Sequence, residues 1–580
     1  MQQNKQDVFL RLMAYMKPHW RKLLLALALV LAATAGNLLR PIIIGRAIDT
    51  ITSGGLFSSI VWYFAFYIIL LLSATACNML QMLMLQKLGQ DIIFQLRQEI
   101  FAHIHRLSLR FFDVTPVGRI VTRVTNDVET LNELFSTILV TMVKNAVLIL
   151  GYAGVMLYFQ WRLALLGFAL LPVVFFLTHV FTRLYRSTHR ITRTKLSALN
   201  TYLSENLSAM KLIQIFHRER EKRAEFSQRS EDLFRSNFRE IVVYGTFQPL
   251  IYLISIISLA IVLGFGGRLV MGDVISIGTL FIFTSYVRSF FEPIQSLSDQ
   301  FGTLQAAMAA GEKIFTLMDQ EPDVKDPDLP LPMVSPVLGR VEFSHVWFSY
   351  DGEDWVLRDV SFTIEPGQTV AFVGPTGAGK SSILNLIGRY YDIQKGSITI
   401  DGVDIRNMST DELRHAVGQV QQDVFLFTGD IQNNIRLGNT DISDTDVREA
   451  AEFVNADSFI RKLENGYETA VMERGSTLSA GQRQLLSFAR TLAFDPAILA
   501  MDEATANIDT ETEALIQDAM ERLMHGRTTI VVAHRLSTIQ HADKIMVIHK
   551  GKLREQGTHQ ELLAQNGIYK KLYDLQLQEH

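Results

Sequence analysis

The sequence predicts two parts: a membrane all-α part with long cytoplasmic helical extensions, followed by an α/β part built around a phosphate-binding loop. Hydrophobic residues make up 48 % of the 580 positions, and before about residue 300 they gather in long runs. After about residue 335 the runs are short and β-rich, and a glycine-rich loop joins one of them to a helix-like stretch. We therefore expect a transmembrane domain over 1–320, a linker over 321–336 and a nucleotide-binding domain over 337–580.

Six apolar runs in the first part are each near the roughly 20 residues with which a helix crosses a bilayer. The polar N-terminal segment, 1–7, lacks a cleavable-signal pattern, so we expect the first run to be a retained membrane helix. Gln160-Trp161-Arg162 separates the third run from the fourth and predicts a tight reversal with an interfacial aromatic residue. The approximate spans are 21–45, 58–85, 136–160, 162–184, 243–266 and 274–294.

The basic residues of the first part predict its orientation. Two long connections, 86–135 and 186–240, are rich in arginine and lysine, whereas the loops on the opposite side carry only Arg46, Arg162 and Arg268. By the positive-inside rule, both termini and both long connections face the cytoplasm. We expect a multi-pass protein of a bacterial inner (plasma) membrane, because no organellar targeting segment is obvious.

The second long connection is predicted to be helical. From Val173 to Tyr244 it contains neither glycine nor proline, and a 50-residue loop without such breakers is improbable in an ordered protein. We expect the membrane helices to continue into the cytoplasm and turn around there. A basic loop that binds lipid headgroups is the alternative.

Two charged residues fall within the predicted spans. Arg288 has Glu292 one helical turn later, and this carboxylate is placed to neutralise it. Lys144 has no local partner, so two interpretations stay open: it lines a cavity, or it snorkels to the cytoplasmic surface.

The glycine-rich loop predicts binding of a nucleoside triphosphate. It follows the apolar strand Thr369–Val373, and its glycines let consecutive backbone N–H groups turn inward around an anion. Lys380 is predicted to reach the terminal phosphates of ATP, and the Ser381 hydroxyl to ligate Mg²⁺. The predicted phosphate-binding residues are Gly374, Pro375, Thr376, Gly377, Ala378, Gly379, Lys380, Ser381 and Ser382.

Charge and cysteine content exclude several classes of protein. A net charge of −4 argues against a nucleic-acid binder held by bulk charge, so we expect no nucleic-acid partner. The single cysteine, Cys77, lies in an apolar run and excludes both a disulfide framework and a cysteine metal site within the chain.

An acidic pair closes a second apolar strand in the α/β part. Asp502 follows Ile498–Met501, at the carboxyl end of a predicted buried strand, where a phosphate-loop fold holds its Mg²⁺. Glu503 comes next and is placed to polarise an attacking water. Two solvated charges would be the alternative if the phosphate loop did not lie upstream.

About 20 residues before Asp502, the segment Leu478, Ser479, Ala480, Gly481 and Gln482 resembles the signature motif of ABC-transporter ATPases. This resemblance implies further roles. Tyr350 is similar to the aromatic residue that stacks on adenine, Gln422 to the glutamine that contacts Mg²⁺ and the attacking water, Asp509 to the D-loop aspartate and His534 to the switch histidine. Glu473-Arg474-Gly475 resembles the short exporter segment that touches the helical couplers, and 111–127 resembles the first coupling region.

The resemblance covers essentially the whole chain and has the layout of an exporter-type half-transporter. It implies an ATP hydrolase that drives export, or flipping between leaflets, of small amphipathic compounds, drugs or lipids. It also implies that two such chains dimerise, each ATP lying between the phosphate loop of one chain and the signature of the other.

The signature departs from the family pattern, because Ala480 stands where the first of two glycines is usual. The D-loop also differs, since Ala506-Asn507-Ile508-Asp509 replaces Ser-Ala-Leu-Asp. Glu503 and His534, in contrast, match the family pattern. The chain therefore resembles the half of a heterodimer that supplies the competent phosphate loop, acidic residues and histidine. A homodimeric flippase-like exporter that tolerates the alanine is the alternative.

Other classes fit the sequence less well. A nucleotide-gated channel or regulator would normally add regulatory segments or a second half, and importers usually carry membrane and ATPase parts on separate chains. A soluble ATPase acting on DNA or ribosomes conflicts with six membrane spans.

Overall fold

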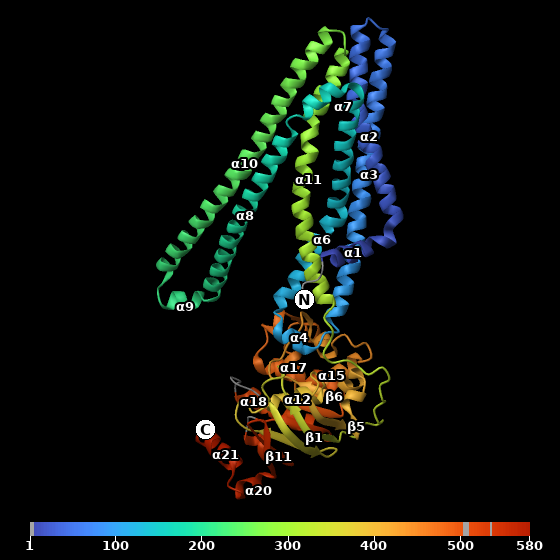
Figure 1. The fold of residues 1–580 in the computed structure, drawn as a ribbon. Coiled ribbons are helices and arrows are strands. Elements are labelled where there is room, and N and C mark those ends of the chain that lie inside the picture. Colours follow the sequence, from blue (N-terminus) through green and yellow to red (C-terminus); the bar gives the residue numbers. More distant parts are fainter. Residues whose placement is uncertain (1–4, 503–509, 534–535, 580) are drawn as a thin grey trace. The chain divides into compact units, whose positions relative to one another are not determined.

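The computed structural model describes residues 5–502, 510–533 and 536–579. The chain divides into two compact units (Figure 1). We call Met1–His105 with Gly118–Gln320 the membrane unit, and Arg106–Val117 with Glu321–His580 the nucleotide unit. The division after Gln320 coincides with the end of the first predicted domain, but the short segment 106–117 belongs with the nucleotide unit.

Every regular element described in the membrane unit is helical, and several helices are much longer than a bilayer requires. The long connection predicted to be helical is confirmed: α8 and α10 run antiparallel and are joined through α9, forming the long hairpin in Figure 1. The helices are α1 (Lys5–Met16), α2 (Trp20–Thr52), α3 (Phe57–Ile104), α5 (Val117–Thr122), α6 (Val128–Glu133), α7 (Leu139–Phe168), α8 (Leu171–Ser208), α9 (Met210–Ile215), α10 (Glu219–Met271) and α11 (Ile277–Met318).

Four helical stretches among the described residues are long and apolar enough to cross a membrane: Gln6–Thr52, Phe57–Ile104, Val117–Phe168 and Glu219–Met271. The predicted fourth span, 162–184, is divided by the helix break between α7 and α8. The predicted sixth span lies in α11, which carries Arg288, Glu292 and Pro293 in its apolar part. Six spans therefore stay a prediction.

The predicted reversal at Gln160 is a local departure from helical geometry, with φ −160° and ψ 99° inside α7. The expected pairing of Arg288 with Glu292 does not occur among the described residues, and both residues are exposed. Lys144 is half-buried in α7 and has no ion-pair partner in the described part of the chain.

One end of the membrane unit is held by close packing of α2 against α11. A side-chain carbon added to Gly278 would overlap the carbonyl oxygen of Gly45, so the two backbones touch. Asp49 at the end of α2 accepts hydrogen bonds from the Gly278 N–H and the Ser276 hydroxyl, each at 2.7 Å. These contacts satisfy a backbone N–H group in the first turn of α11 and attach this helix to the end of α2.

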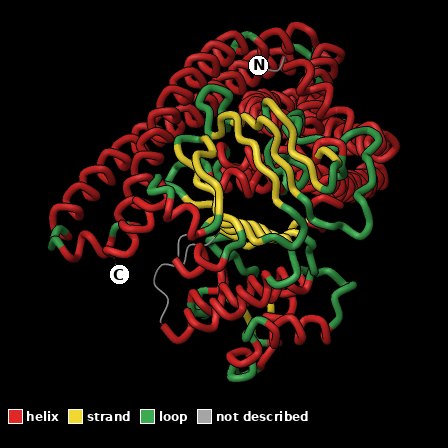
Figure 2. Tube along the Cα trace, turned by 90° about the horizontal axis from the view of Figure 1, so that it is seen from below, coloured by secondary structure: helices red, strands yellow, loops and turns green. Residues whose placement is uncertain are grey.

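The nucleotide unit contains the strands, which appear in yellow in Figure 2. A six-stranded sheet has the order β12-β11-β3-β10-β9-β6, and a four-stranded antiparallel sheet has the order β2-β1-β4-β5. The strands are β1 (Val341–Phe348), β2 (Leu357–Ile364), β3 (Thr369–Val373), β4 (Lys395–Ile400), β5 (Val403–Asp404), β6 (Val417–Val420), β7 (Gly429–Asp430), β8 (Ala470–Val471), β9 (Ile498–Asp502), β10 (Thr528–Val532), β11 (Lys544–His549) and β12 (Lys552–Gly557).

The central strands β3, β10 and β9 of the six-stranded sheet are almost entirely buried because both faces are covered, whereas the edge strand β12 is polar and partly exposed. In β3, Val370 and Phe372 face a core shared with the four-stranded sheet, whereas Ala371 and Val373 face a helical core. The helices of this unit are α4 (Leu109–Val114), α12 (Lys380–Ile387), α13 (Thr410–Ala416), α14 (Ile431–Arg436), α15 (Asp444–Phe453), α16 (Asp457–Ile460), α17 (Ala480–Ala493), α18 (Thr510–Met524), α19 (Leu536–His541), α20 (His559–Ala564) and α21 (Ile568–Glu579).

Candidate nucleotide site

The predicted site residues gather at one edge of the six-stranded sheet. Strands β11, β3, β10, β9 and β6 are parallel, so their carboxyl ends meet at the same edge. The phosphate loop follows β3, Asp502 ends β9 and Gln422 follows β6. In α/β sheets this edge is where ligands bind.

The loop between β3 and α12 has the backbone that its glycines predict. Gly374, Gly377 and Gly379 have φ values of 152°, 78° and 104°, which residues with a side chain rarely adopt. A side-chain carbon at Gly374 would overlap the carbonyl oxygen of Ile548, whereas one at Gly377 would meet nothing within 4 Å. Gly374 is thus required by packing as well as by conformation, and Gly377 by conformation alone.

Lys380 is the first residue of α12, and only 6 % of it is exposed. Its Nζ donates hydrogen bonds to the carbonyl oxygens of Gly374 at 2.7 Å and Pro375 at 3.2 Å. Burial lowers the pKa of Lys380 from its ordinary value, and the nearby Asp502 carboxylate opposes that shift. The ammonium group therefore lies inside the loop, positioned for phosphate oxygens to replace the carbonyl groups as its partners.

The donor set at this edge fits Mg²⁺. Ser381 is exposed at the start of α12, and Gln422 is exposed after β6. Asp502 is partly buried and close enough to Lys380 to affect its pKa. A hydroxyl, an amide and a carboxylate are all oxygen donors, and Mg²⁺ is commonly bound through one or two carboxylates together with substrate phosphates.

Tyr350 lies beside the loop in a turn that holds it in place. Asp351 accepts hydrogen bonds from the Ser349 hydroxyl and from the N–H groups of Glu353 and Asp354, and these bonds lower its pKa to about 2. The Tyr350 hydroxyl lies 3.0 Å from the Ser382 hydroxyl. Its ring is partly exposed beside α12, as a base-stacking residue requires.

Tyr391 is a neighbour of this site that the sequence did not indicate. Its ring meets the Tyr350 ring edge to face, with centroids 5.0 Å apart. Its hydroxyl donates a 2.5 Å hydrogen bond to Asp113 of α4, in the predicted first coupling region. Burial and the Asp113 carboxylate raise the pKa of Tyr391. These residues are 278 positions apart, so no local pattern could have indicated the contact.

The predicted signature segment begins α17. Ser479 caps the helix: its hydroxyl accepts from the Gln482 N–H at 3.2 Å, while the Gln482 side chain accepts from the Ser479 N–H at 2.9 Å. Leu478 and Gly481 are buried, whereas Ser479 and Ala480 are exposed. Ala480 occupies the first helical position, which requires no glycine. The segment Glu473–Gly475 forms a short turn just before it.

Three predicted site residues, Glu503, Asp509 and His534, lie outside the described residues. Their roles rest on the sequence.

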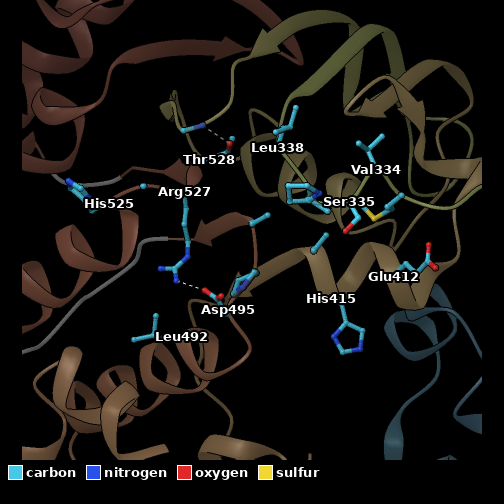
Figure 3. Close-up of a pocket in the computed structure, with 18 of the residues that line it drawn as sticks. Val334, Ser335, Leu338, Glu412, His415, Leu492, Asp495, His525, Arg527 and Thr528 are labelled. Atoms are coloured by element: carbon cyan, nitrogen blue, oxygen red, sulfur yellow. Dashed lines mark hydrogen bonds and ion pairs between the residues drawn. The ribbon is translucent and has the colours of Figure 1, made fainter. Parts of the chain in front are cut away.

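A large cavity of about 1260 Å³ lies at the opposite, amino-terminal ends of β9 and β10 (Figure 3). None of its described lining residues is a predicted site residue. Two arginines of its lining form ion pairs with lining aspartates: Arg527 with Asp495 at 2.6 Å, and Arg522 with Asp518 at 2.8 Å. This cavity is therefore separate from the candidate nucleotide site.

Comparisons with known proteins match both units. Residues 23–294 match the family model "ABC transporter transmembrane region", and residues 357–506 match the model "ABC transporter". The "Probable multidrug resistance ABC transporter ATP-binding/permease protein YheH" of Bacillus subtilis is 40 % identical over 498 residues, which cover 85 % of this chain and 73 % of that protein. The "ATP-dependent lipid A-core flippase" of Syntrophus aciditrophicus is 34 % identical over 577 residues, covering 99 % and 95 %.

A solved structure described as a bacterial Atm1-family ABC exporter with ATP bound superposes on the chain with a TM-score of 0.80. It is 29 % identical and covers 96 % of this chain and 98 % of its own. The likeness extends across both units.

Proposed function

Because this chain belongs to the ABC transporter family, with a transmembrane region and an ABC ATPase coupled to transport on one polypeptide, we propose that it is one half of a dimeric exporter. The exporter uses ATP to move amphipathic drugs or lipids across, or between the leaflets of, a membrane. The observation that carries this proposal is the carboxyl edge of the six-stranded sheet, where the loop with Lys380 follows β3 and Asp502 ends β9, on a chain with several membrane-length helices.

Each residue at the site has a proposed task. Lys380 and the loop N–H groups bind the β- and γ-phosphates, and Tyr350 stacks on the adenine ring. Ser381, Asp502 and Gln422 would hold Mg²⁺, which when bound supplies charge neutralisation between the phosphates. Glu503 orients or activates the attacking water, while His534 steadies the γ-phosphate; Asp509 acts from the D-loop at the dimer interface.

Contacts in the structure support a route from Tyr350 to α4, in the predicted first coupling region. Tyr350 contacts Tyr391, and Tyr391 donates to Asp113 of α4. A change in the position of Tyr350 when ATP binds would therefore act through Tyr391 on the first coupling region. Hydrolysis would then reset the pair of chains.

Ala480 supports a heterodimer, with this chain as the half that supplies the competent Lys380, Asp502, Glu503 and His534. In the chain itself Ala480 is exposed and helical, so any cost of its methyl group arises where another chain's nucleotide approaches α17. A homodimer remains the second candidate, because the small methyl group does not disturb the fold of α17.

The export function is tested with Glu503→Gln in inside-out membrane vesicles. The variant is expected to bind ATP with wild-type affinity and to lose hydrolysis and accumulation of a fluorescent amphiphile together. Accumulation that continues in the variant would contradict an ATP-driven exporter, and uptake in right-side-out vesicles alone would indicate an importer.

The partner is tested by purifying the chain from its native membrane. Identification of a second half-transporter in the complex supports the heterodimer. Full ATPase activity from this chain alone, expressed without that partner, would contradict it. Protease accessibility of tags at the two ends tests the proposed cytoplasmic location of both termini in a bacterial plasma membrane.

A further inference from the structure

The side chain of Gln394 replaces a strand partner at the end of β1. Strands β1 and β4 pair in antiparallel fashion, and their register ends with Trp347 opposite Lys395. Next to that pair, the Gln394 Oε1 accepts a hydrogen bond from the Ser349 N–H, and the Gln394 Nε2 donates one to the Ser349 carbonyl oxygen, each at 2.9 Å. A residue in an antiparallel strand makes the same exchange of two bonds. The pairing therefore extends to the residue directly before Tyr350.

Ser349 has a hydrogen-bond partner for each of its polar groups. The residue is only 2 % exposed, and its hydroxyl donates to Asp351 at 2.8 Å and accepts from the Gly352 N–H at 3.0 Å. The Gln394 amide is the partner of both backbone groups. A buried N–H or carbonyl group without a partner is costly, so the Ser349 backbone is expected to move toward water when this amide is removed.

The Tyr350 ring is held at points other than its backbone. It meets the rings of Phe348 and Tyr391 edge to face, with centroids 4.7 Å and 5.0 Å away. Its hydroxyl lies 3.0 Å from that of Ser382, at the end of the phosphate loop. These contacts orient the ring, whereas Gln394 holds the backbone from which the ring projects. A shift of that backbone would therefore move the ring relative to the phosphate loop.

A role in folding alone explains Gln394 less well. The residue is exposed in the turn before β4, where its amide could bond water freely. Both polar atoms of the amide nevertheless bond the backbone of Ser349. Bonds of this kind contribute modestly to stability, so a substitution should leave the fold intact while it changes the geometry beside Tyr350.

We propose that Gln394 is a positioning residue for the nucleotide base. It holds the Ser349 backbone so that the Tyr350 ring stands where an adenine ring stacks once the triphosphate lies in the loop. Gln394 acts through Tyr350, so it sets the affinity for the base and leaves the binding of the triphosphate to Lys380 and the loop. The inference deepens the proposed function and rests on its assignment of Tyr350 as the base-stacking residue.

The test compares ATP with inorganic tripolyphosphate, which has a triphosphate chain but no base. The full-length protein is purified with its co-purifying chain, and ATP hydrolysis gives the kcat, the KM for ATP and the Ki of tripolyphosphate as a competitive inhibitor. In Gln394→Ala the KM for ATP is expected to rise about three- to tenfold, the loss that one or two modest hydrogen bonds imply. The kcat should change less than about twofold, and the Ki of tripolyphosphate should stay the same.

Gln368→Ala is the matched control. Gln368 also holds a backbone N–H with its side-chain oxygen, that of Glu365 at 3.2 Å, but it does so in the turn before β3. This variant should keep the wild-type KM for ATP and the wild-type Ki of tripolyphosphate. The melting temperatures of Gln368→Ala and Gln394→Ala should be similar, which separates lost positioning from lost folding.

A double variant tests whether Gln394 acts through Tyr350. Tyr350→Ala should raise the KM for ATP about tenfold, as the loss of base stacking implies, without changing the Ki of tripolyphosphate. Adding Gln394→Ala to Tyr350→Ala should raise the KM no further, because the ring that Gln394 positions is already absent.

The inference is overturned, and the proposed function stands, if Tyr350→Ala raises the KM for ATP while Gln394→Ala leaves it unchanged. It is also overturned if the KM for ATP and the Ki of tripolyphosphate rise together in Gln394→Ala, or if the two substitutions have additive effects in the double variant. If Tyr350→Ala itself leaves the KM unchanged, the base-stacking role in the proposed function is wrong, and the role of Gln394 is wrong with it.

Discussion

Two helix starts in the nucleotide unit, those of α12 and α17, both belong to predicted phosphate-binding segments, yet they are built differently. The cap of α12 is Gly379, which has positive φ and no side chain to accept a hydrogen bond from the helix. The cap of α17 is Ser479, whose side chain and that of Gln482 satisfy each other's backbone N–H groups.

This difference shows what each helix start can do within one chain. At α12 no side chain caps the helix start, and Lys380 lies within the loop, so the positive helix end is available to phosphate. At α17 one N–H is already bonded to the serine oxygen. The Ser479 hydroxyl hydrogen remains free to donate, which suits a contact with a phosphate that another chain brings.

The largest expected effect distinguishes the two kinds of glycine in the α12 loop. Gly374→Ala is expected to cost about 2–5 kcal/mol of unfolding free energy, because it combines backbone strain with overlap on the Ile548 carbonyl. Gly377→Ala, the control, should cost only about 1–2 kcal/mol, since its site is open and only the positive φ opposes the side chain. Chemical denaturation of the detergent-solubilised protein measures both. Equal costs would mean that the Ile548 contact does not constrain the loop.

The second effect concerns Lys380. Lys380→Ala should weaken ATP binding about 10–100-fold, the loss expected for charge-assisted hydrogen bonds to phosphate. Stability without nucleotide should change little, because the charged group is already penalised by burial. Fluorescent-nucleotide binding measures the affinity, with Lys552→Ala on β12 as an exposed control. If Lys380→Ala left the affinity for ATP unchanged, the loop would not contribute to ATP binding as proposed.

The starts of α12 and α17 differ in how far the sequence predicts them. The strand–loop–helix order and the strand Thr369–Val373 were predicted because they depend on neighbouring residues: apolar strand, spaced glycines, then Lys380. The capping box of α17 also follows a local pattern, Ser479 with Gln482, although it was interpreted only as part of a signature.

Long-range features could not be predicted in the same way. The Tyr391–Asp113 hydrogen bond joins segments with no shared periodicity. The break between α7 and α8, by contrast, has a local signal inside the fourth apolar run, because Pro172 lies in the first turn of α8. The sequence does not indicate the Gln394 amide, because its place beside Ser349 depends on the pairing of β1 with β4. The proposed role of Glu503 still rests on the sequence.

The third effect tests whether the cap of α17 has a task beyond folding. Ser479→Ala should reduce stability by about 1 kcal/mol, the usual cost of losing a serine cap. Ser443→Ala is the matched control, because Ser443 caps α15 with the same reciprocal arrangement, to Asp446. Both variants should lose similar stability, but only Ser479→Ala should also lower ATP hydrolysis by the assembled transporter. If the two variants lower hydrolysis equally, Ser479 is a structural cap and α17 does not contact nucleotide.

The smallest effect is expected at Ala480 and separates the two kinds of dimer. Ala480→Gly removes an exposed methyl group at the first position of α17 and should cost less than about 1 kcal/mol of stability, the helix-propensity difference. In a heterodimer Ala480 faces only the weaker site, so total hydrolysis should change less than about twofold, equivalent to about 0.4 kcal/mol in the barrier. In a homodimer the same residue faces both sites, and removing the methyl group from both should raise turnover several-fold, because backbone N–H groups approach the γ-phosphate more closely. ATPase rates of the purified complex, measured at saturating ATP and matched expression, therefore decide whether Ala480 at the start of α17 faces one nucleotide site or two.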